Sequence, residues 1–323
     1  MTRHSNLRDF IDLAFARSTP LCRARFGELV ADVFVDGGAA HQGFERALLK
    51  TDAPPEVSFA IVTGEDPELL RIVPDHPERF QVVSDSEVYA YWRPTPSRLF
   101  AVYDRVRKRG AVWFPHQIPA GAIGQPCEPL VHAAIEPTGW VVAHGAAVGR
   151  EGRFLLLVGS GRSGKSTATL ACIKAGWSYA GDDLVLLNPA RSLVAPLFSS
   201  VRLRHSGAAA FQSLADAAFM VSDDDGAPRY ELRLDQLPSG GTVAAVLGVR
   251  RQGASEVSVV PARAADYLGP LLRDSTSRAP GCTPSMTPKL LAAGRMAPGF
   301  IVDTGIDPAG IPGGLGTFLE TLL

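Results

Sequence analysis

The sequence predicts an α/β protein whose larger C-terminal part is built on a mixed sheet and is preceded by a smaller, β-rich α+β domain. In residues 126–323, strand-like apolar runs alternate with helical segments around a glycine-rich loop. In residues 1–125, short apolar runs are separated by turn residues, as in a β-rich domain. The proline- and glycine-rich stretch 115–129 is the expected linker between them.

The bulk composition is that of an ordinary globular protein. The chain has 323 residues, of which 46% are hydrophobic and 20% charged. Because the formal net charge is only -1, neither nucleic acid nor a membrane surface is an expected partner. The four cysteines are far apart in the sequence, as in proteins of a reducing compartment. Without a signal-like or membrane-spanning apolar run, the cytoplasm is the expected location.

In the N-terminal part, the apolar residues Leu7, Phe10, Ile11 and Ala14 recur at helical spacing and predict a short amphipathic helix. Apolar runs that end at turn residues predict strands. The expected strands are 29–35, 59–62, 87–92, 98–106 and 110–114. The last two are expected to form a hairpin.

In the C-terminal part, helical periodicity and strand-like runs alternate. The expected helices are 130–136, 165–174, 264–273 and 314–322. The expected strands are 140–148, 154–158, 184–187, 194–203, 230–234, 243–250 and 257–260. This alternation predicts the mixed sheet.

The glycine-rich loop carries the most specific signal. It reads Gly159, Ser160, Gly161, Arg162, Ser163, Gly164, Lys165, Ser166, and Thr167 follows it. Its glycines allow successive N–H groups to converge on phosphate oxygens, and the helix that begins there adds its positive dipole end. Lys165 would then contact the β and γ phosphates, while the Ser166 hydroxyl would bind magnesium. We therefore expect residues 159–167 to bind ATP with Mg²⁺; the alternative is a tight turn with a solvated lysine.

Two adjacent acidic residues follow the glycine-rich loop in the sequence. Asp182 and Asp183 lie 17 and 18 residues after Lys165, one helix and one short strand later. Because successive strand residues point to opposite sides, the two acids are expected to have different roles. One would hold magnesium, and the other would accept the proton of an attacking hydroxyl. The alternative is a turn pair that caps a neighbouring element.

His144, followed by Gly145, lies on the strand before the loop strand. The order His144-Gly145, then 159–166, then Gly181-Asp182-Asp183 resembles the catalytic core of the HPr serine kinase/phosphorylase family. More distantly it resembles ATP-dependent phosphoenolpyruvate carboxykinases. The resemblance covers about residues 140–187 and implies a mixed-sheet P-loop kinase core of that type.

The resemblance also implies roles for single residues. Asp182 would be the base that accepts a serine proton, Asp183 would bind the metal, and His144 would sit beside the acids. The Glu-x-Arg-Gly signature of HPr kinases is absent, which leaves the protein substrate open. The N-terminal region is more similar to the HPr-kinase-like enzymes associated with lasso peptides, which phosphorylate a serine of a precursor peptide.

Three arginines are further candidates. Arg202 and Arg204 alternate on one expected strand and would share a face that could clamp a phosphoryl group, or they form a solvated face. Arg250 follows the apolar strand residues 243–249 and could likewise reach the phosphates from the end of that strand.

The expected function is therefore an ATP- and magnesium-dependent kinase whose partner is a peptide or small protein with an acceptor serine. A small-molecule phosphotransferase and a non-catalytic nucleotide-binding switch are the alternatives, and a homo-oligomer stays open.

Overall fold

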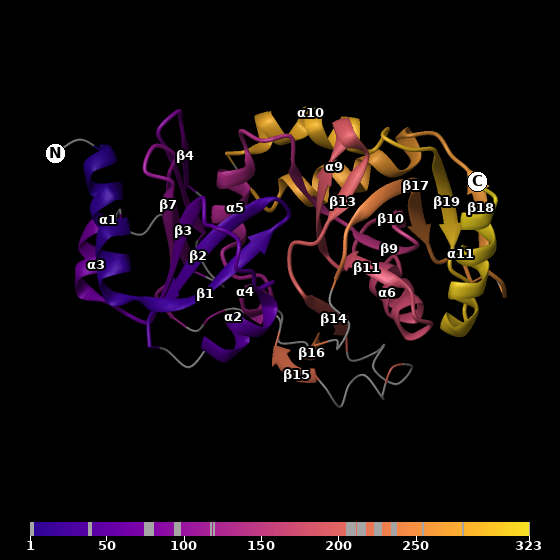
Figure 1. The fold of residues 1–323 in the computed structure, drawn as a ribbon, viewed down its shortest axis with the longest axis horizontal. Coiled ribbons are helices and arrows are strands. Elements are labelled where there is room, and N and C mark those ends of the chain that lie inside the picture. The colour runs from indigo at the N-terminus through magenta and orange to yellow at the C-terminus, as the bar shows by residue number, and fades with distance from the viewer. Residues whose placement is uncertain are drawn as a thin grey trace. The chain divides into compact units, whose positions relative to one another are not determined.

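The computed structural model describes most of the chain. The described residues are 3–37, 41–73, 81–93, 98–116, 118, 120–204, 211, 218–222, 228–233, 238–253, 255–279 and 281–322. The chain forms two compact units, and each contains helices and a mixed sheet (Figure 1). An α/β protein with mixed sheets is therefore confirmed.

The first unit comprises Met1–Pro137 with two later segments, Ser222–Ala227 and Arg278–Pro284. Its strands are β1 (Thr19–Phe26), β2 (Leu29–Val35), β3 (Val57–Thr63), β4 (Gln81–Ser84), β5 (Val88–Arg93), β6 (Leu99–Asp104) and β7 (Arg109–Phe114). They form one seven-stranded sheet in the order β1-β2-β3-β7-β6-β5-β4. The pairs β2–β3 and β3–β7 are parallel and the others antiparallel, which includes the predicted β6–β7 hairpin.

Helix α1 (Arg3–Arg17) covers one face of this sheet, as its apolar spacing predicts. Phe10, Ile11 and Ala14 are fully buried in a cluster with Trp113 of β7. The other helices of the unit are α2 (His41–Ala47), α3 (Pro67–Ile72), α4 (Ala120–Gly124) and α5 (Glu128–Ile135).

The predicted linker is not an extended connection. Helix α4, residues 120–124, lies entirely within the stretch 115–129, and α5 begins within it at Glu128. Helix α5 packs on β6 and β7 of the first sheet, and the first unit continues to Pro137, beyond the predicted boundary at residue 125.

The second unit comprises Thr138–Val221, Pro228–Ser277 and Ser285–Leu323. Its main strands are β8 (Val141–His144), β9 (Ala146–Arg150), β10 (Arg153–Val158), β11 (Ser178–Gly181), β12 (Leu184–Asn188), β13 (Leu193–Ala195), β17 (Gly241–Arg250), β18 (Ser258–Pro261) and β19 (Gly299–Asp303). A smaller sheet contains β14 (Ser200–Arg204), β16 (Pro228–Arg233) and β15 (Ala218–Ser222).

The main sheet branches at β17. Along one path the order is β11-β9-β10-β17-β13-β12-β8, and β19 also pairs with β17 and with β18. The pairs β10–β17 and β17–β19 are parallel, so these three strands end at the same edge of the sheet. The remaining pairs are antiparallel.

The helices of this unit are α6 (Lys165–Lys174), α9 (Ala265–Thr276), α10 (Thr283–Ala293) and α11 (Ile311–Glu320), together with the short 3-10 turns η1 (Pro189–Arg191) and η3 (Pro308–Gly310). The helices predicted at 165–174, 264–273 and 314–322 are confirmed as α6, α9 and α11 within a few residues. Helix α10 and strand β19 were not expected from the sequence.

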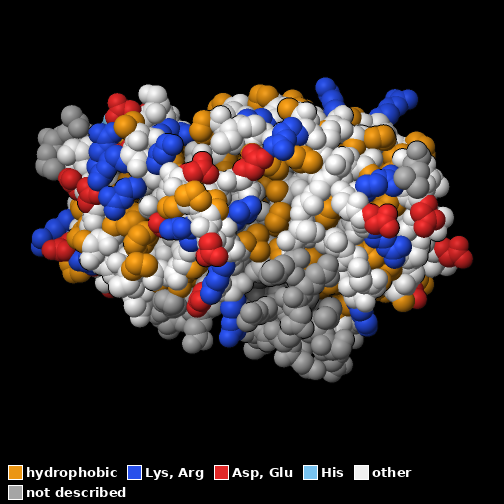
Figure 2. All heavy atoms as spheres, viewed as in Figure 1, with side chains coloured by type: hydrophobic (Ala, Val, Ile, Leu, Met, Phe, Trp, Pro, Cys, Tyr) orange, Lys and Arg blue, Asp and Glu red, His pale blue; other side chains and the backbone are white. Residues whose placement is uncertain are grey.

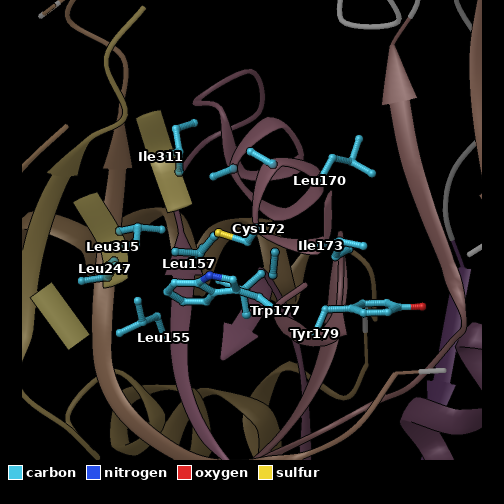
Figure 3. Close-up of a cluster of buried hydrophobic side chains, with 14 of the residues drawn as sticks. Leu155, Leu157, Leu170, Cys172, Ile173, Trp177, Tyr179, Leu247, Ile311 and Leu315 are labelled. Carbon is cyan, nitrogen blue, oxygen red and sulfur yellow. The ribbon is translucent and has the colours of Figure 1, made fainter. Parts of the chain in front are cut away.

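The core of the second unit surrounds Trp177 (Figure 3). Leu155 and Leu157 of β10 and Leu247 of β17 point from the sheet to Trp177, and Leu315 of α11 packs against the same cluster. Alternate residues of β10 therefore face the α6 and α11 side, which fixes the strand's register and the position where it ends.

Charged side chains of both signs are interspersed on the face drawn in Figure 2. Of the helices that the structure describes, none combines the length and the apolar character needed to cross a bilayer.

Candidate functional site

The glycine-rich loop connects the end of β10 at Val158 to the start of α6 at Lys165. Gly164, with φ 107°, is the N-cap of α6, and a glycine supplies no side chain to cap the helix. The first N–H groups of this helix therefore remain available to an anion. Arg162 also has a positive φ, 69°, and turns the loop back toward the helix.

Lys165 folds over this loop. Its Nζ atom donates to Gly159 O at 2.6 Å and to Ser160 O at 3.3 Å, and the side chain is buried. A buried ammonium group held to the loop backbone places a positive charge where the converging N–H groups would hold phosphates.

The other loop residues vary in exposure. Ser160, Gly161 and Arg162 are exposed. Ser163, Ser166 and Thr167 are half-buried, the last two in the first turn of α6. The side chains that were predicted to contact the nucleotide thus line one strand-to-helix turn.

The two acids lie at the same edge of the sheet as this loop. Gly181, the last residue of β11, pairs with Ala147 of β9, which pairs in turn with Leu156 of β10. Strands β11 and β10 both run antiparallel to β9, so both end at one edge. With about 4.8 Å between neighbouring strands, the backbones of β11 and β10 are separated by about 10 Å there.

Asp182 and Asp183 interrupt a long antiparallel pair. Strand β11 pairs with β9 before them and β12 with β8 after them. In the interruption, Gly145 N donates to Asp183 O at 3.1 Å. Asp183 has a left-handed φ of 72°, a conformation that aspartate tolerates better than most residues. The structure thus holds the acid pair opposite His144 and Gly145.

The acids have different environments. Asp182 is buried, with 4% of its surface exposed. Asp183 is half-buried, and its Oδ1 lies 3.3 Å from His144 Nδ1. His144 is itself held in place, because its backbone N donates to the buried Ser275 hydroxyl of α9 at 2.8 Å. His144 therefore contacts one of the two acids.

The ends of β17 and β19 complete this edge. Arg250, the last residue of β17, is exposed and pairs with Asp303 of β19. A Cβ atom on Gly159 would lie 2.9 Å from Val249 O, so only a glycine fits where the loop crosses β17. Arg250 directly follows Val249, the residue that the loop contacts, so Arg250 lies close to the loop.

Asp303 and Thr304 were not predicted from the sequence as residues of the site. Both are buried polar residues, and a Cβ on Gly164 would lie 3.4 Å from Thr304 Oγ1. The signal available was the parallel strand β19 itself, a short apolar run followed by an acid, which resembles the run before Asp182.

Arg202 and Arg204 lie on β14, where they pair with Glu231 and Arg229 of β16. Their side chains lie outside the described part of the structure, so the predicted phosphate clamp stays a prediction.

No protein-family model and no curated protein sequence matches this chain.

Among the described residues, no group of three or more histidines, cysteines and acids forms a ready metal site. Magnesium at phosphate sites typically takes only one or two carboxylates and completes its shell with phosphate oxygens and water. The hydroxyl of Ser166 and the carboxylate of Asp183 fit that donor set.

Proposed function

We propose that the chain is an ATP- and magnesium-dependent kinase that transfers the γ-phosphate to a serine hydroxyl of a peptide or small protein. The observation that carries the proposal is the placement of the glycine loop and the Asp182-Asp183 pair at one edge of the sheet, two strands apart. A loop for phosphates beside a buried carboxylate is the arrangement that phosphoryl transfer to an alcohol requires.

In this proposal, the loop N–H groups and Lys165 bind and orient the phosphates. Ser166 and Asp183 hold magnesium, which when bound neutralises charge on the phosphate oxygens. His144 orients Asp183 through the 3.3 Å contact, in the way that outer residues orient metal ligands.

Asp182 is the proposed general base. It accepts the proton of the serine hydroxyl as the serine oxygen bonds to the γ-phosphorus and the bond from that phosphorus to the bridging oxygen of ADP breaks. Asp182 is buried, so bulk water is largely kept from the carboxylate that would accept this proton. Arg250 would stabilise the charge that spreads over the transferred group.

The fold type implied by this proposal is a P-loop kinase core similar to that of HPr kinases. The chain departs from that family's substrate-related signature, so we propose a peptide acceptor other than HPr, such as a lasso precursor peptide. In the seven-stranded sheet of the first unit, the outer edge of β1 is partly paired with residues 49–51, so β4 is the edge strand that an extended peptide could extend by backbone pairing.

The proposal is tested by incubating the purified chain with Mg-ATP and a pool of serine-containing peptides, with mass spectrometry to detect phosphopeptides. Phosphoserine formation that is lost in an Asp182→Asn variant supports the proposal. Phosphorylation of small alcohols alone would favour a small-molecule phosphotransferase. ATP binding without any transfer would favour a nucleotide-binding switch.

A further inference from the structure

The hydroxyl of one largely buried residue at the loop has no role in the proposed function. Thr304 follows β19, and only 4% of its surface is exposed. A Cβ atom placed on Gly164 would lie 3.4 Å from Thr304 Oγ1 and 3.8 Å from Val249 Cγ1. The Thr304 hydroxyl therefore lies beside Gly164, the N-cap residue of α6.

The backbone around Thr304 is firmly held. Thr304 N donates to Arg250 O at 3.3 Å. The carboxylate of Asp303 accepts from Gln252 N at 3.2 Å and from Gly305 N at 3.1 Å. Asp303 thus ties the ends of β17 and β19 together and fixes the direction of the neighbouring threonine.

The hydroxyl itself is not used by the fold. Within the described ranges of the chain, Thr304 Oγ1 makes no hydrogen bond. Because Thr304 is largely buried, few water molecules can reach this hydroxyl, and a ligand oxygen could serve as its hydrogen-bond partner. Such a group next to an uncapped helix N-terminus points to a ligand that supplies the missing partner.

We propose that Thr304 is a nucleotide-binding residue whose hydroxyl donates a hydrogen bond to a phosphate oxygen held at the start of α6. A hydroxyl can donate to a phosphate that already accepts from the loop N–H groups, since each phosphate oxygen has several lone pairs. The inference rests on the proposed binding of ATP at the loop and adds a strand outside the glycine motif to the site.

The test compares Thr304→Val with Thr304→Ser. Valine keeps the branched shape and removes the hydroxyl, whereas serine keeps the hydroxyl and removes a methyl group. The Kd for Mg-ATP is measured by calorimetry, and the melting temperature is measured without nucleotide. We expect valine to weaken binding about 10-fold or more, as for the loss of one hydrogen bond to a charged group. Serine should bind within about 2-fold of the parent.

The melting temperature separates a ligand contact from a structural one. If the hydroxyl makes no hydrogen bond in the free protein, valine should leave the melting temperature within about 3 °C of that of the parent. A structural hydroxyl would give a lower melting temperature or an unfolded variant, and either result overturns the inference.

Experiment can distinguish a failure of the proposed function from a failure of the role of Thr304. If the parent chain does not bind Mg-ATP, the proposed function fails and this inference fails with it. If the parent binds and Thr304→Val binds equally well, only the role of Thr304 is wrong. An equal loss of affinity in Thr304→Ser and Thr304→Val also overturns it, because the retained hydroxyl would then have no effect.

Discussion

His144 Nδ1 lies 3.3 Å from Asp183 Oδ1, across the interruption between β11 and β12. The two residues are far apart in the sequence, and the antiparallel pairing of β8 with β12 brings them together. If Asp183 binds magnesium, His144 is the residue that fixes its orientation.

Removing this contact should weaken the metal site. We expect His144→Ala to raise the Mg²⁺ concentration needed for half-maximal activity by about 10-fold or more. His116→Ala, which changes an exposed histidine of the first unit, is the matched control. An unchanged magnesium dependence in His144→Ala would contradict the proposed role.

Lys165 and Lys174 lie at opposite ends of α6, so they form a matched pair of substitutions. Lys165→Ala removes the buried ammonium group at the loop, and we expect Mg-ATP to bind at least about 30-fold more weakly, since truncating one partner of a buried charge pair costs 2–5 kcal/mol or more. Lys174→Ala, at the exposed end, should bind as the parent does. Equal affinities for the two variants in a calorimetric titration would place the nucleotide elsewhere.

Substitution of Asp182 and substitution of Asp183 should affect activity in different ways. Asp182→Asn is expected to bind Mg-ATP normally and to lower the rate of transfer about 10²–10⁴-fold, the range for loss of a general base. Asp183→Asn is expected to lose activity at low magnesium and to recover part of it when magnesium is raised. Steady-state rates over a magnesium series distinguish the two, and transfer by Asp182→Asn at the parent rate would remove the base assignment.

The cysteines test the fold independently of function. Burial raises the pKa of Cys172 and of Cys282 to about 12, and that of the half-buried Cys22 to about 11. A raised thiol pKa means that less of the reactive thiolate is present at a given pH. In the native protein at pH 9, iodoacetamide should therefore label Cys22 first, and the buried thiols should react only in denaturant. Rapid labelling of Cys172 in the native protein would show that the core around Trp177 is not packed as described.

Local patterns in the sequence were sufficient for much of the second unit. The strand 154–158, the loop and the helix 165–174 were predicted together because each signal is local: an apolar run, glycines and a helix stopped by Ala175-Gly176. The position of Asp182 and Asp183 at the loop's edge also followed from the length of that helix and strand.

Other features depend on long-range pairing and could not be predicted in this way. The run 140–148 reads as one strand, yet Gly145 divides it into β8 and β9, which pair with different strands. Helix α10 contains Pro288, a residue that argues against a helix in sequence patterns. The position of Asp303 and Thr304 beside the glycine loop depends on the pairing of β19 with β17, which joins segments far apart in the sequence.

The most direct measurement is a crystal structure of the chain with magnesium and a non-hydrolysable ATP analogue. The account predicts that the triphosphate lies over residues 159–166, with the metal on Ser166 and the Asp182 carboxylate on the side of the γ-phosphate. An analogue bound away from this loop at saturating concentration, or a γ-phosphate that points away from Asp182, would contradict it.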